Sequence, residues 1–201
     1  MEDNPMGLKL IAITPEKSLP DEVQRIGRLI DAGFDFVHLR KPQMNEAEMC
    51  RFIESIPSRY YRHLKLNDFH HLARRYGLGG IHLNARNPQR PQGFSGNVSR
   101  SCHSMEEAEK AITECDYVFL SPIFDSICKQ GYQSRFSLEE LRHWDLLPSE
   151  QVVALGGITA ERIGMLREIG FGGVAFLGYL FEEMPSDEFE NRIESIILKS
   201  K

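Results

Sequence analysis

The stretch Gln151–Thr159, QVVALGGIT, sets the expectation for the fold. Its apolar run Val152–Leu155 is bounded by Gly156 and Gly157, which is typical of a buried parallel strand. A predicted helix, Ala160–Ile169, follows at once, with the threonine that ends the quoted stretch as its candidate N-cap. Such a junction directs backbone N–H groups toward a position where an anion is favoured. It predicts half of a phosphate-binding site, unless the glycines only make a tight turn.

A second stretch, Phe171–Leu180 (FGGVAFLGYL), repeats the pattern of an apolar strand ending in a glycine, here Gly178. Two strand-end glycines late in a chain of alternating strands and helices are typical of the phosphate site after strands seven and eight of a (β/α)8 barrel. Each glycine alone indicates a turn. The two together, in this order, favour a phosphate site.

Short apolar segments alternate with amphipathic ones along the whole chain. Eight strand–helix units in alternation predict an α/β fold, a single (β/α)8 TIM barrel over residues 1–201, rather than an open doubly wound sheet. Ser104 and Glu107 form a capping-box pattern at one helix start. The predicted strands, besides those of the two glycine stretches, are Leu8–Thr14, Phe34–Leu39, Leu64–Leu66, Gly80–Leu83, Asn97–Cys102 and Tyr117–Leu120. The other predicted helices are Asp21–Ala32, Asn45 to the residue before Pro57, His70–Tyr76, Ser104 to about Cys115, Leu138–Trp144 and one from Ser186.

Length and composition argue against several classes of protein. The 201 residues suit one domain with a full core, and a formal net charge of -5 argues against nucleic acid or an anionic membrane as the partner. No apolar run approaches a membrane span and Met1–Gly7 is no signal peptide, so a cytoplasmic protein is expected. The cysteines lack the spacing of a metal or disulfide framework, and only Cys128, beside Lys129, has a setting that favours a thiolate.

Polar side chains gather at the predicted carboxyl ends of the strands, where barrels of this kind carry their chemistry. The set is cationic and polar with a single acid, Asp68, which suits the binding of phosphates, with that carboxylate as a candidate ligand for a divalent cation. A charged residue just beyond a strand is equally what a surface loop shows. The residues in these positions, besides the glycines, are Arg40, Asn67, Asp68, His82, Asn84, Ser101, His103, Ser121 and Lys129.

Six motifs make the chain resemble the thiamine phosphate synthase superfamily. They stand in the same order and at similar spacings as in that superfamily, and together they cover nearly the whole chain. A single motif such as GGI is weak, but six in register are specific. The motifs are HLR at 38–40, LND at 66–68, GIHL at 80–83, CHSMEEA at 102–108, DYVFLSPIF at 116–124 and VALGGI at 153–158.

The resemblance implies an enzyme of thiamine biosynthesis that binds small phosphorylated molecules. In the synthases, hydroxymethylpyrimidine diphosphate loses pyrophosphate with the help of Mg²⁺, and the pyrimidine-methyl cation is captured by the nitrogen of thiazole phosphate. This chemistry requires charge clamps on the departing pyrophosphate and fixed placement of the thiazole.

The resemblance also assigns roles to individual residues. Arg40 and Asn67 would hold the diphosphate, Asp68 would bind Mg²⁺, and Ser101 would contact the pyrimidine. The family uses Thr and Lys after strand six, where this chain has Ser126 and Lys129, and backbone amides of Gly157 and Gly178 would hold the thiazole phosphate.

The chain departs from the synthase pattern at two positions. The motif of type QLREK reads HLRKP here, so Pro42 replaces a diphosphate-binding lysine, for which Lys41 is a candidate substitute. Asn87 stands where the family has an aspartate as second Mg²⁺ ligand, and a neutral amide is a poorer ligand for a hard cation. Both departures weaken leaving-group assistance.

Other features resemble the TenI-type branch, thiazole tautomerases that shift a proton in thiazole phosphate. These are the HxR after strand two, RSCHS at 100–104 and CKQG at 128–131. That branch is expected to use a histidine where this chain has Pro122; His38 and His103 are alternative bases, or structural histidines. A synthase is the first hypothesis. A tautomerase and a non-catalytic regulatory protein that binds thiazole phosphate stay open, followed by an unrelated barrel such as a sugar-phosphate epimerase.

Overall fold

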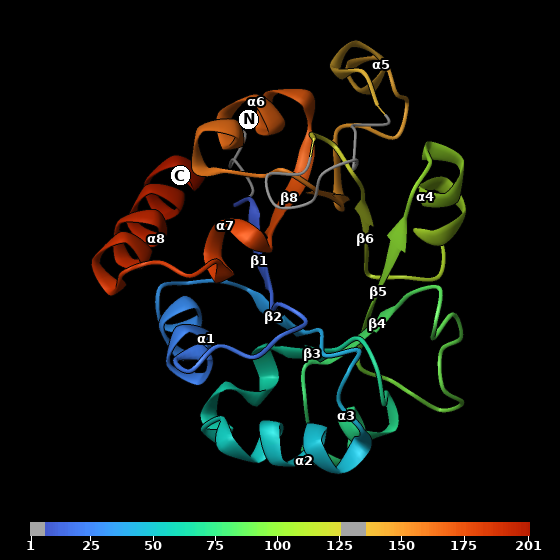
Figure 1. The fold of residues 1–201 in the computed structure, drawn as a ribbon. Helices are drawn as coiled ribbons and strands as arrows, with labels where there is room; N and C mark the ends of the chain where they lie inside the picture. The colour runs from blue at the N-terminus through green and yellow to red at the C-terminus, as the bar shows by residue number, and fades with distance from the viewer. Residues whose placement is uncertain (1–6, 126–135) are drawn as a thin grey trace.

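Eight parallel strands pair in chain order, and the last pairs with the first, so the sheet closes into a barrel. The computed structural model describes residues 7–125 and 136–201, and Ser126, Cys128 and Lys129 lie outside the described residues. Figure 1 shows the helices arranged around the ring of strands. The predicted (β/α)8 barrel is confirmed. Its strands are β1 (Lys9–Ile13), β2 (Phe36–Leu39), β3 (Leu64–Leu66), β4 (Gly80–Leu83), β5 (Asn97–Cys102), β6 (Tyr117–Leu120), β7 (Ser149–Leu155) and β8 (Phe171–Phe176).

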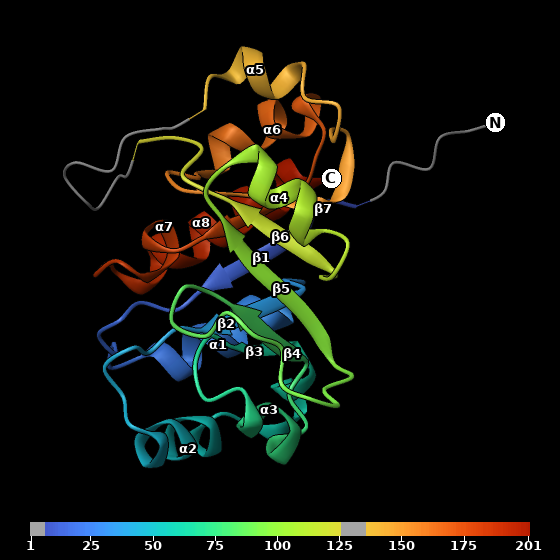
Figure 2. The same cartoon turned by 90° about the vertical axis from the view of Figure 1, so that its right-hand side faces the viewer.

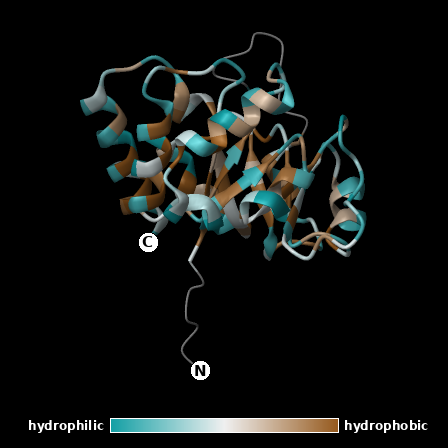
Figure 3. Cartoon of the chain, turned by 90° about the horizontal axis from the view of Figure 1, so that it is seen from below, coloured by the Kyte–Doolittle hydropathy of each residue, from teal (hydrophilic) through white to brown (hydrophobic). Residues whose placement is uncertain are grey.

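Helices cover the outer face of the barrel, and the view from the side shows them flanking the strands (Figure 2). Their apolar residues pack against a brown, hydrophobic sheet, whereas their outer surfaces carry much teal, hydrophilic colour (Figure 3). None of the described helices combines the length and apolar composition needed to cross a bilayer. The helices are α1 (Glu22–Asp31), α2 (Glu46–Ser55), α3 (His71–Tyr76), α4 (Met105–Ala111), α5 (Leu138–Arg142), α6 (Ile163–Ile169), α7 (Gly178–Phe181) and α8 (Ser186–Ser200), with 3-10 turns η1 (Ser58–His63) and η2 (Ala160–Arg162).

The two glycine stretches differ in detail from their prediction. β7 begins at Ser149, before its apolar run, because Ser149 pairs with Phe171 ahead of a register irregularity. β8 ends at Phe176, and Gly178 is therefore the first residue of α7 rather than the end of a strand. Thr159 occupies the predicted N-cap position, but of the short 3-10 turn η2 that precedes α6, and its side chain makes no capping hydrogen bond.

Two helix starts show how local sequence sets the element boundaries. Asn45 and Glu48 form a complete capping box at the start of α2. At α4, Ser104 accepts a hydrogen bond from the Glu107 N–H at 3.1 Å, as predicted, but the Glu107 carboxylate accepts from the N–H of His103 instead. Each arrangement satisfies N–H groups that a helix start leaves without intrahelical partners.

The barrel interior contains a polar layer rather than only branched aliphatic side chains. His38 of β2 lies 2.7 Å from the hydroxyl of Tyr117, through Nε2, and both are fully enclosed. His82 of β4 lies between two hydroxyls, with Nδ1 3.0 Å from Ser99 Oγ. Lys65 of β3 is entirely buried; its ammonium group lies 4.0 Å from the Tyr117 ring centroid and donates to Asn97 and Ser99.

Burial dominates the electrostatics of this layer. It holds the pKa of His38 and that of His82 well below 6.5, and the nearby Lys65 lowers both further. Burial likewise lowers the pKa of Lys65 well below its usual value. The imidazoles are therefore neutral near pH 7, and each can accept one hydrogen bond and donate another.

We expect the fold to lose stability in mild acid. Below pH 6.5 the unfolded chain takes up protons on His38 and His82 whereas the folded chain does not, so the unfolding free energy falls as pH falls. The two histidines together contribute a slope of up to about 2.7 kcal/mol per pH unit. Urea titrations between about pH 7 and pH 5.5 measure it.

The variant His82→Asn should lower the slope, because one of the two fully buried histidines no longer contributes. Replacing the exposed His143 by Asn serves as the matched control and should leave it unchanged. A stability that stays flat over this pH range in the natural sequence would contradict the assignment.

Candidate functional site

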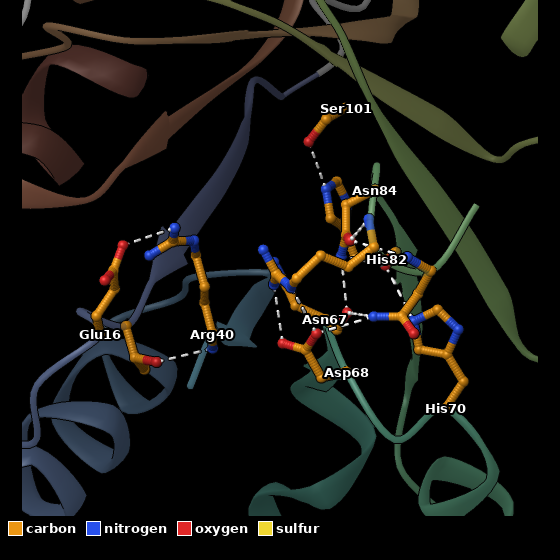
Figure 4. Close-up of polar contacts among 11 residues, drawn as sticks. Glu16, Arg40, Asn67, Asp68, His70, His82, Asn84 and Ser101 are labelled. Carbon is orange, nitrogen blue, oxygen red and sulfur yellow. Dashed lines mark hydrogen bonds and ion pairs between the residues drawn. The ribbon is translucent and has the colours of Figure 1, made fainter. Parts of the chain in front are cut away.

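The carboxyl ends of β2 and β3 bring Arg40, Asn67 and Asp68 to one side of the barrel mouth. Leu39 pairs with Leu66, and the N–H of Asn67 lies 3.3 Å from the Leu39 carbonyl oxygen, so the residues after both strands are neighbours. Figure 4 shows these side chains on the same side of the mouth. Asn67 and Asp68 are only 5% and 9% exposed.

Arg40 is positioned from the loop that follows β1. Its backbone N–H donates to Thr14 Oγ1 at 3.0 Å, and its Nη2 donates to Glu16 Oε1 at 2.9 Å (Figure 4). The Arg40 side chain keeps 24% of its surface exposed. It is thus a partly accessible cation, whose present partner is an acidic side chain that a ligand phosphate could replace.

The side chain of Lys41 is engaged in a buried ion pair. Its Nζ lies 2.7 Å from the Glu22 carboxylate and 2.8 Å from the carbonyl oxygen of Pro15, and the Lys41 and Glu22 side chains are 0% and 1% exposed. Burial lowers the pKa of Lys41 and raises that of Glu22, and the ion pair opposes both shifts. In this arrangement Glu22 and the Pro15 carbonyl oxygen engage the ammonium group of Lys41, the candidate substitute for the lysine that Pro42 replaces.

Asp68 is held by nitrogen donors. Arg86 binds it in a bidentate manner, with Nε 3.1 Å from Oδ1 and Nη2 3.0 Å from Oδ2, and Asn87 Nδ2 donates to Oδ1 at 2.8 Å. Within residues 7–125 and 136–201, no group of three or more His, Cys, Asp or Glu side chains could hold a metal ion. The structure thus places the predicted Mg²⁺ ligand in an ion pair rather than among oxygen ligands.

The turn after β4 positions Arg86. Asn84 Oδ1 accepts hydrogen bonds from the backbone N–H groups of Arg86 and Asn87, and its Nδ2 donates to the Asn67 carbonyl oxygen at 2.7 Å. Sequence reasoning missed Arg86. The signal for it was available: a basic residue follows β4, beside the strand end that carries the single acid Asp68.

The candidate histidines differ in accessibility. His38 lies inside the barrel, and its Nδ1 and the Oδ1 of Asn67 are buried atoms without a hydrogen bond among the described residues. The Asn67 side chain is close enough to raise the pKa of His38 against the larger, opposing effect of burial. His103 is exposed after β5, with Nδ1 3.0 Å from the Ser121 carbonyl oxygen.

Two predicted site residues at β4 and β5 contact each other. Ser101 Oγ lies 2.8 Å from His82 Nε2, so the residue expected to contact the pyrimidine ends the polar layer of the barrel interior at the mouth (Figure 4). His70, just before α3, instead supports the wall, with Nε2 3.0 Å from the His82 carbonyl oxygen.

The glycine side of the mouth lies across the barrel, because β3 and β7 are four strands apart in a ring of eight. Gly156 and Gly157 adopt φ values of 101° and 62°, which favour glycine. A Cβ on Gly157 would lie 2.4 Å from the Asp125 carbonyl oxygen, so close packing of the preceding loop also requires glycine there. Gly178 follows the neighbouring strand β8 on the same side of the mouth, since Leu155 at the end of β7 pairs with Ala175 near the end of β8.

A cation that sequence reasoning missed lies next to Gly157. Arg162 donates through Nη1 to the Gly157 carbonyl oxygen, and its guanidinium carbon lies 4.1 Å from the Phe124 ring centroid. An arginine five residues after a glycine turn is not distinctive in sequence, because its direction depends on how η2 is placed.

The family model described as thiamine monophosphate synthase matches residues 10–180. The chain belongs to the thiamine monophosphate synthase family. A thiamine-phosphate synthase from Shigella sonnei (strain Ss046) is 32% identical over 167 residues, which cover 77% of this chain and 78% of that protein. One from Caldicellulosiruptor saccharolyticus is 24% identical over 183 residues, 87% of this chain and 81% of that protein.

Solved structures agree with the assignment to this enzyme family. The crystal structure of thiamine phosphate pyrophosphorylase from Bacteroides thetaiotaomicron has 32% sequence identity and a TM-score of 0.85, and the match covers 96% of this chain and 98% of that one. A thiamine phosphate pyrophosphorylase from Pyrococcus furiosus, with 20% identity and a TM-score of 0.74 over 96% of this chain and 95% of that one, shows the fold alone.

Removing the charge of Lys41 should destabilise the fold rather than only affect the mouth. In Lys41→Met the carboxylate of Glu22 stays buried without its partner, which costs about 3–5 kcal/mol of unfolding free energy. The double variant with Glu22→Leu should recover most of the loss. Urea unfolding measures both, with the exposed Lys17→Met as control. A single variant as stable as the natural chain would mean that Lys41 is not the buried partner of Glu22.

Proposed function

We propose that this family member is a thiamine-phosphate synthase, which joins hydroxymethylpyrimidine diphosphate to thiazole phosphate and releases pyrophosphate. The supporting observation is the placement of two phosphate-compatible regions on opposite sides of one barrel mouth. Arg40, Asn67 and Arg86 line the side of β2 to β4, and Gly157 and Gly178 follow β7 and β8. Two phosphorylated substrates held at these sides would meet above the polar layer.

In the proposed reaction the bond between the pyrimidine methylene carbon and the diphosphate oxygen breaks, and its electron pair leaves with pyrophosphate. The lone pair of the thiazole nitrogen then forms the new C–N bond. Arg40 and Arg86 would stabilise the negative charge that develops on the leaving group, since a charge-assisted hydrogen bond strengthens as that charge grows. Asn67 would position the diphosphate beside them.

The glycine side would hold the other substrate. Backbone amides of Gly157 and Gly178 are proposed to bind the thiazole phosphate, with Arg162 adding positive charge beside them. Gly156 would contribute through its positive φ, which allows the turn that precedes these amides. Ser101 would contact the pyrimidine from the end of β5, while the roles of Ser126 and Lys129 rest on the resemblance alone.

Magnesium is the cofactor that the resemblance implies, and the residues around Asp68 do not fit it well. A hard cation needs several oxygen ligands, whereas Asp68 faces the N–H groups of Arg86 and Asn87. We therefore assign no step of the reaction to a metal ion.

Purified protein should form thiamine phosphate from the two substrates, as chromatography of the product would show. Arg40→Ala should lower kcat/KM by about 10- to 100-fold, because it removes charge-assisted hydrogen bonds to the leaving group. The exposed Arg74→Ala, which makes the same charge change on α3, should leave it unchanged. Absence of product above background, with and without Mg²⁺, would refute the synthase assignment.

A TenI-type proton shift on thiazole phosphate carboxylate is the second candidate. The buried Nδ1 of His38, for which no hydrogen bond is found among the described residues, favours it, because a neutral imidazole nitrogen can take up a proton. Double-bond migration without the pyrimidine substrate should then be lost in His38→Asn and retained in His143→Asn. His103→Asn tests the exposed alternative base. Binding of thiazole phosphate without synthase or tautomerase activity would favour a non-catalytic protein that binds thiazole phosphate.

A further inference from the structure

The ion pair between Arg86 and Asp68 engages the carboxylate to which the family resemblance assigns Mg²⁺. We propose that Arg86 replaces the divalent cation at this mouth, so that a diphosphate or phosphate ligand binds here without a metal ion. The proposal deepens the proposed function, on which it rests for the identity of the ligand. It assigns the positive charge that a ligand phosphate needs on the β2 to β4 side of the mouth to Arg86, a residue of the chain itself.

The hydrogen-bond directions around Asp68 support this assignment. Three N–H groups point at its carboxylate: Arg86 Nε, Arg86 Nη2 and Asn87 Nδ2. The Asn87 amide cannot be turned round without loss, because its Nδ2 also lies 3.2 Å from the carbonyl oxygen of Asn67. A flip would place an amide oxygen against two acceptor oxygens. The side-chain groups that hydrogen-bond to the Asp68 carboxylate among the described residues are therefore N–H donors, which satisfy an anion and repel a cation.

The same network orients the neighbouring amide. Asn84 Oδ1 accepts hydrogen bonds from two backbone N–H groups, at 2.9 and 3.1 Å, so this oxygen is already engaged within its own loop. The carboxylate of Asp68 is thus left as the one anionic oxygen ligand in the cluster of Asn67, Asp68, Asn84, Arg86 and Asn87. A Mg²⁺ ion would need several oxygens in near-octahedral geometry, and it would have to expel Arg86 to reach them.

Charge leads to the same conclusion. The positive charge of Arg86 already balances the negative charge of the Asp68 carboxylate, and Asn87 is neutral, so the cluster needs no cation for charge balance. A divalent cation placed on Asp68 would lie within a few ångströms of a guanidinium group, where repulsion is strong in a partly buried setting. The Asp68 side chain is 13% exposed, which limits screening by water.

Arg86 also has surface left for a ligand. Its side chain is 48% exposed, and its Nη1 makes no hydrogen bond with the described residues. With Asp68 and Asn87 it lines an open pocket of about 650 Å³ that extends to Pro42 and His71. The guanidinium group can therefore bind Asp68 on one edge and a phosphate oxygen on the other, which a planar group with five N–H donors allows.

Two measurements on the full chain test the proposal without requiring turnover. Calorimetry with inorganic pyrophosphate in EDTA should show binding, and Arg86→Gln should weaken it by about tenfold. The exposed Arg74→Gln is the matched control and should bind as the natural chain does. Electron paramagnetic resonance of Mn²⁺, a stand-in for Mg²⁺, should show no stoichiometric binding to the natural chain.

A double variant tests the replacement directly. Arg86→Gln with Asn87→Asp removes the guanidinium group and adds a second carboxylate, so it should gain stoichiometric Mn²⁺ binding that Arg86→Gln alone lacks. Circular dichroism confirms that each variant is folded. Stoichiometric Mn²⁺ on the natural chain, or pyrophosphate binding that disappears in EDTA or is unaffected by Arg86→Gln, would overturn the proposal.

These results are separable from the synthase assignment. Metal-free pyrophosphate binding through Arg86 without thiamine phosphate formation would support the replacement and refute the activity. Thiamine phosphate formation that depends on Mg²⁺, together with Mn²⁺ bound at Asp68, would support the activity and refute the replacement.

Discussion

Closure of the barrel through the pairing of β1 with β8 is the constraint on which the whole site depends. Lys9 of β1 pairs with Gly173 of β8, and a Cβ at Gly173 would lie only 2.8 Å from that of Lys9. The absence of a side chain at Gly173 therefore lets the first and last strands pair. Without closure the two sides of the mouth would not face each other. The register of eight strands thus sets the distance between the arginine side and the glycine side.

Much of this architecture could be predicted from sequence because apolar runs and turn residues act locally. The strands Leu64–Leu66, Gly80–Leu83, Asn97–Cys102 and Tyr117–Leu120 have the predicted bounds. The ends of elements that depend on tertiary pairing were harder to predict. β7 begins as early as Ser149 because Ser149 pairs with Phe171 of β8, and α4 stops at Ala111, several residues before the predicted end. Pattern indicates which element forms, whereas neighbouring strands decide where it stops.

The site was predictable at the level of position and less so at the level of partners. Arg40, Asn67 and Asp68 lie together because strand ends of a parallel barrel share one rim. That Lys41 turns away to Glu22, and that Arg86 binds Asp68, depends on contacts between residues 19 and 18 positions apart in the sequence. No local pattern encodes such pairs, since either cation could equally have faced solvent.

The chain of hydrogen bonds inside the barrel has a consequence for the mouth. A neutral imidazole carries one proton, and His82 divides its two nitrogens between Ser101 at the rim and Ser99 within. If Ser101 donates its hydroxyl hydrogen, Nδ1 must hold the proton and donate to Ser99; if Ser101 turns that hydrogen toward a ligand, the tautomer reverses. The position of a single proton therefore links the rim to Lys65, deep in the barrel, which shares Ser99.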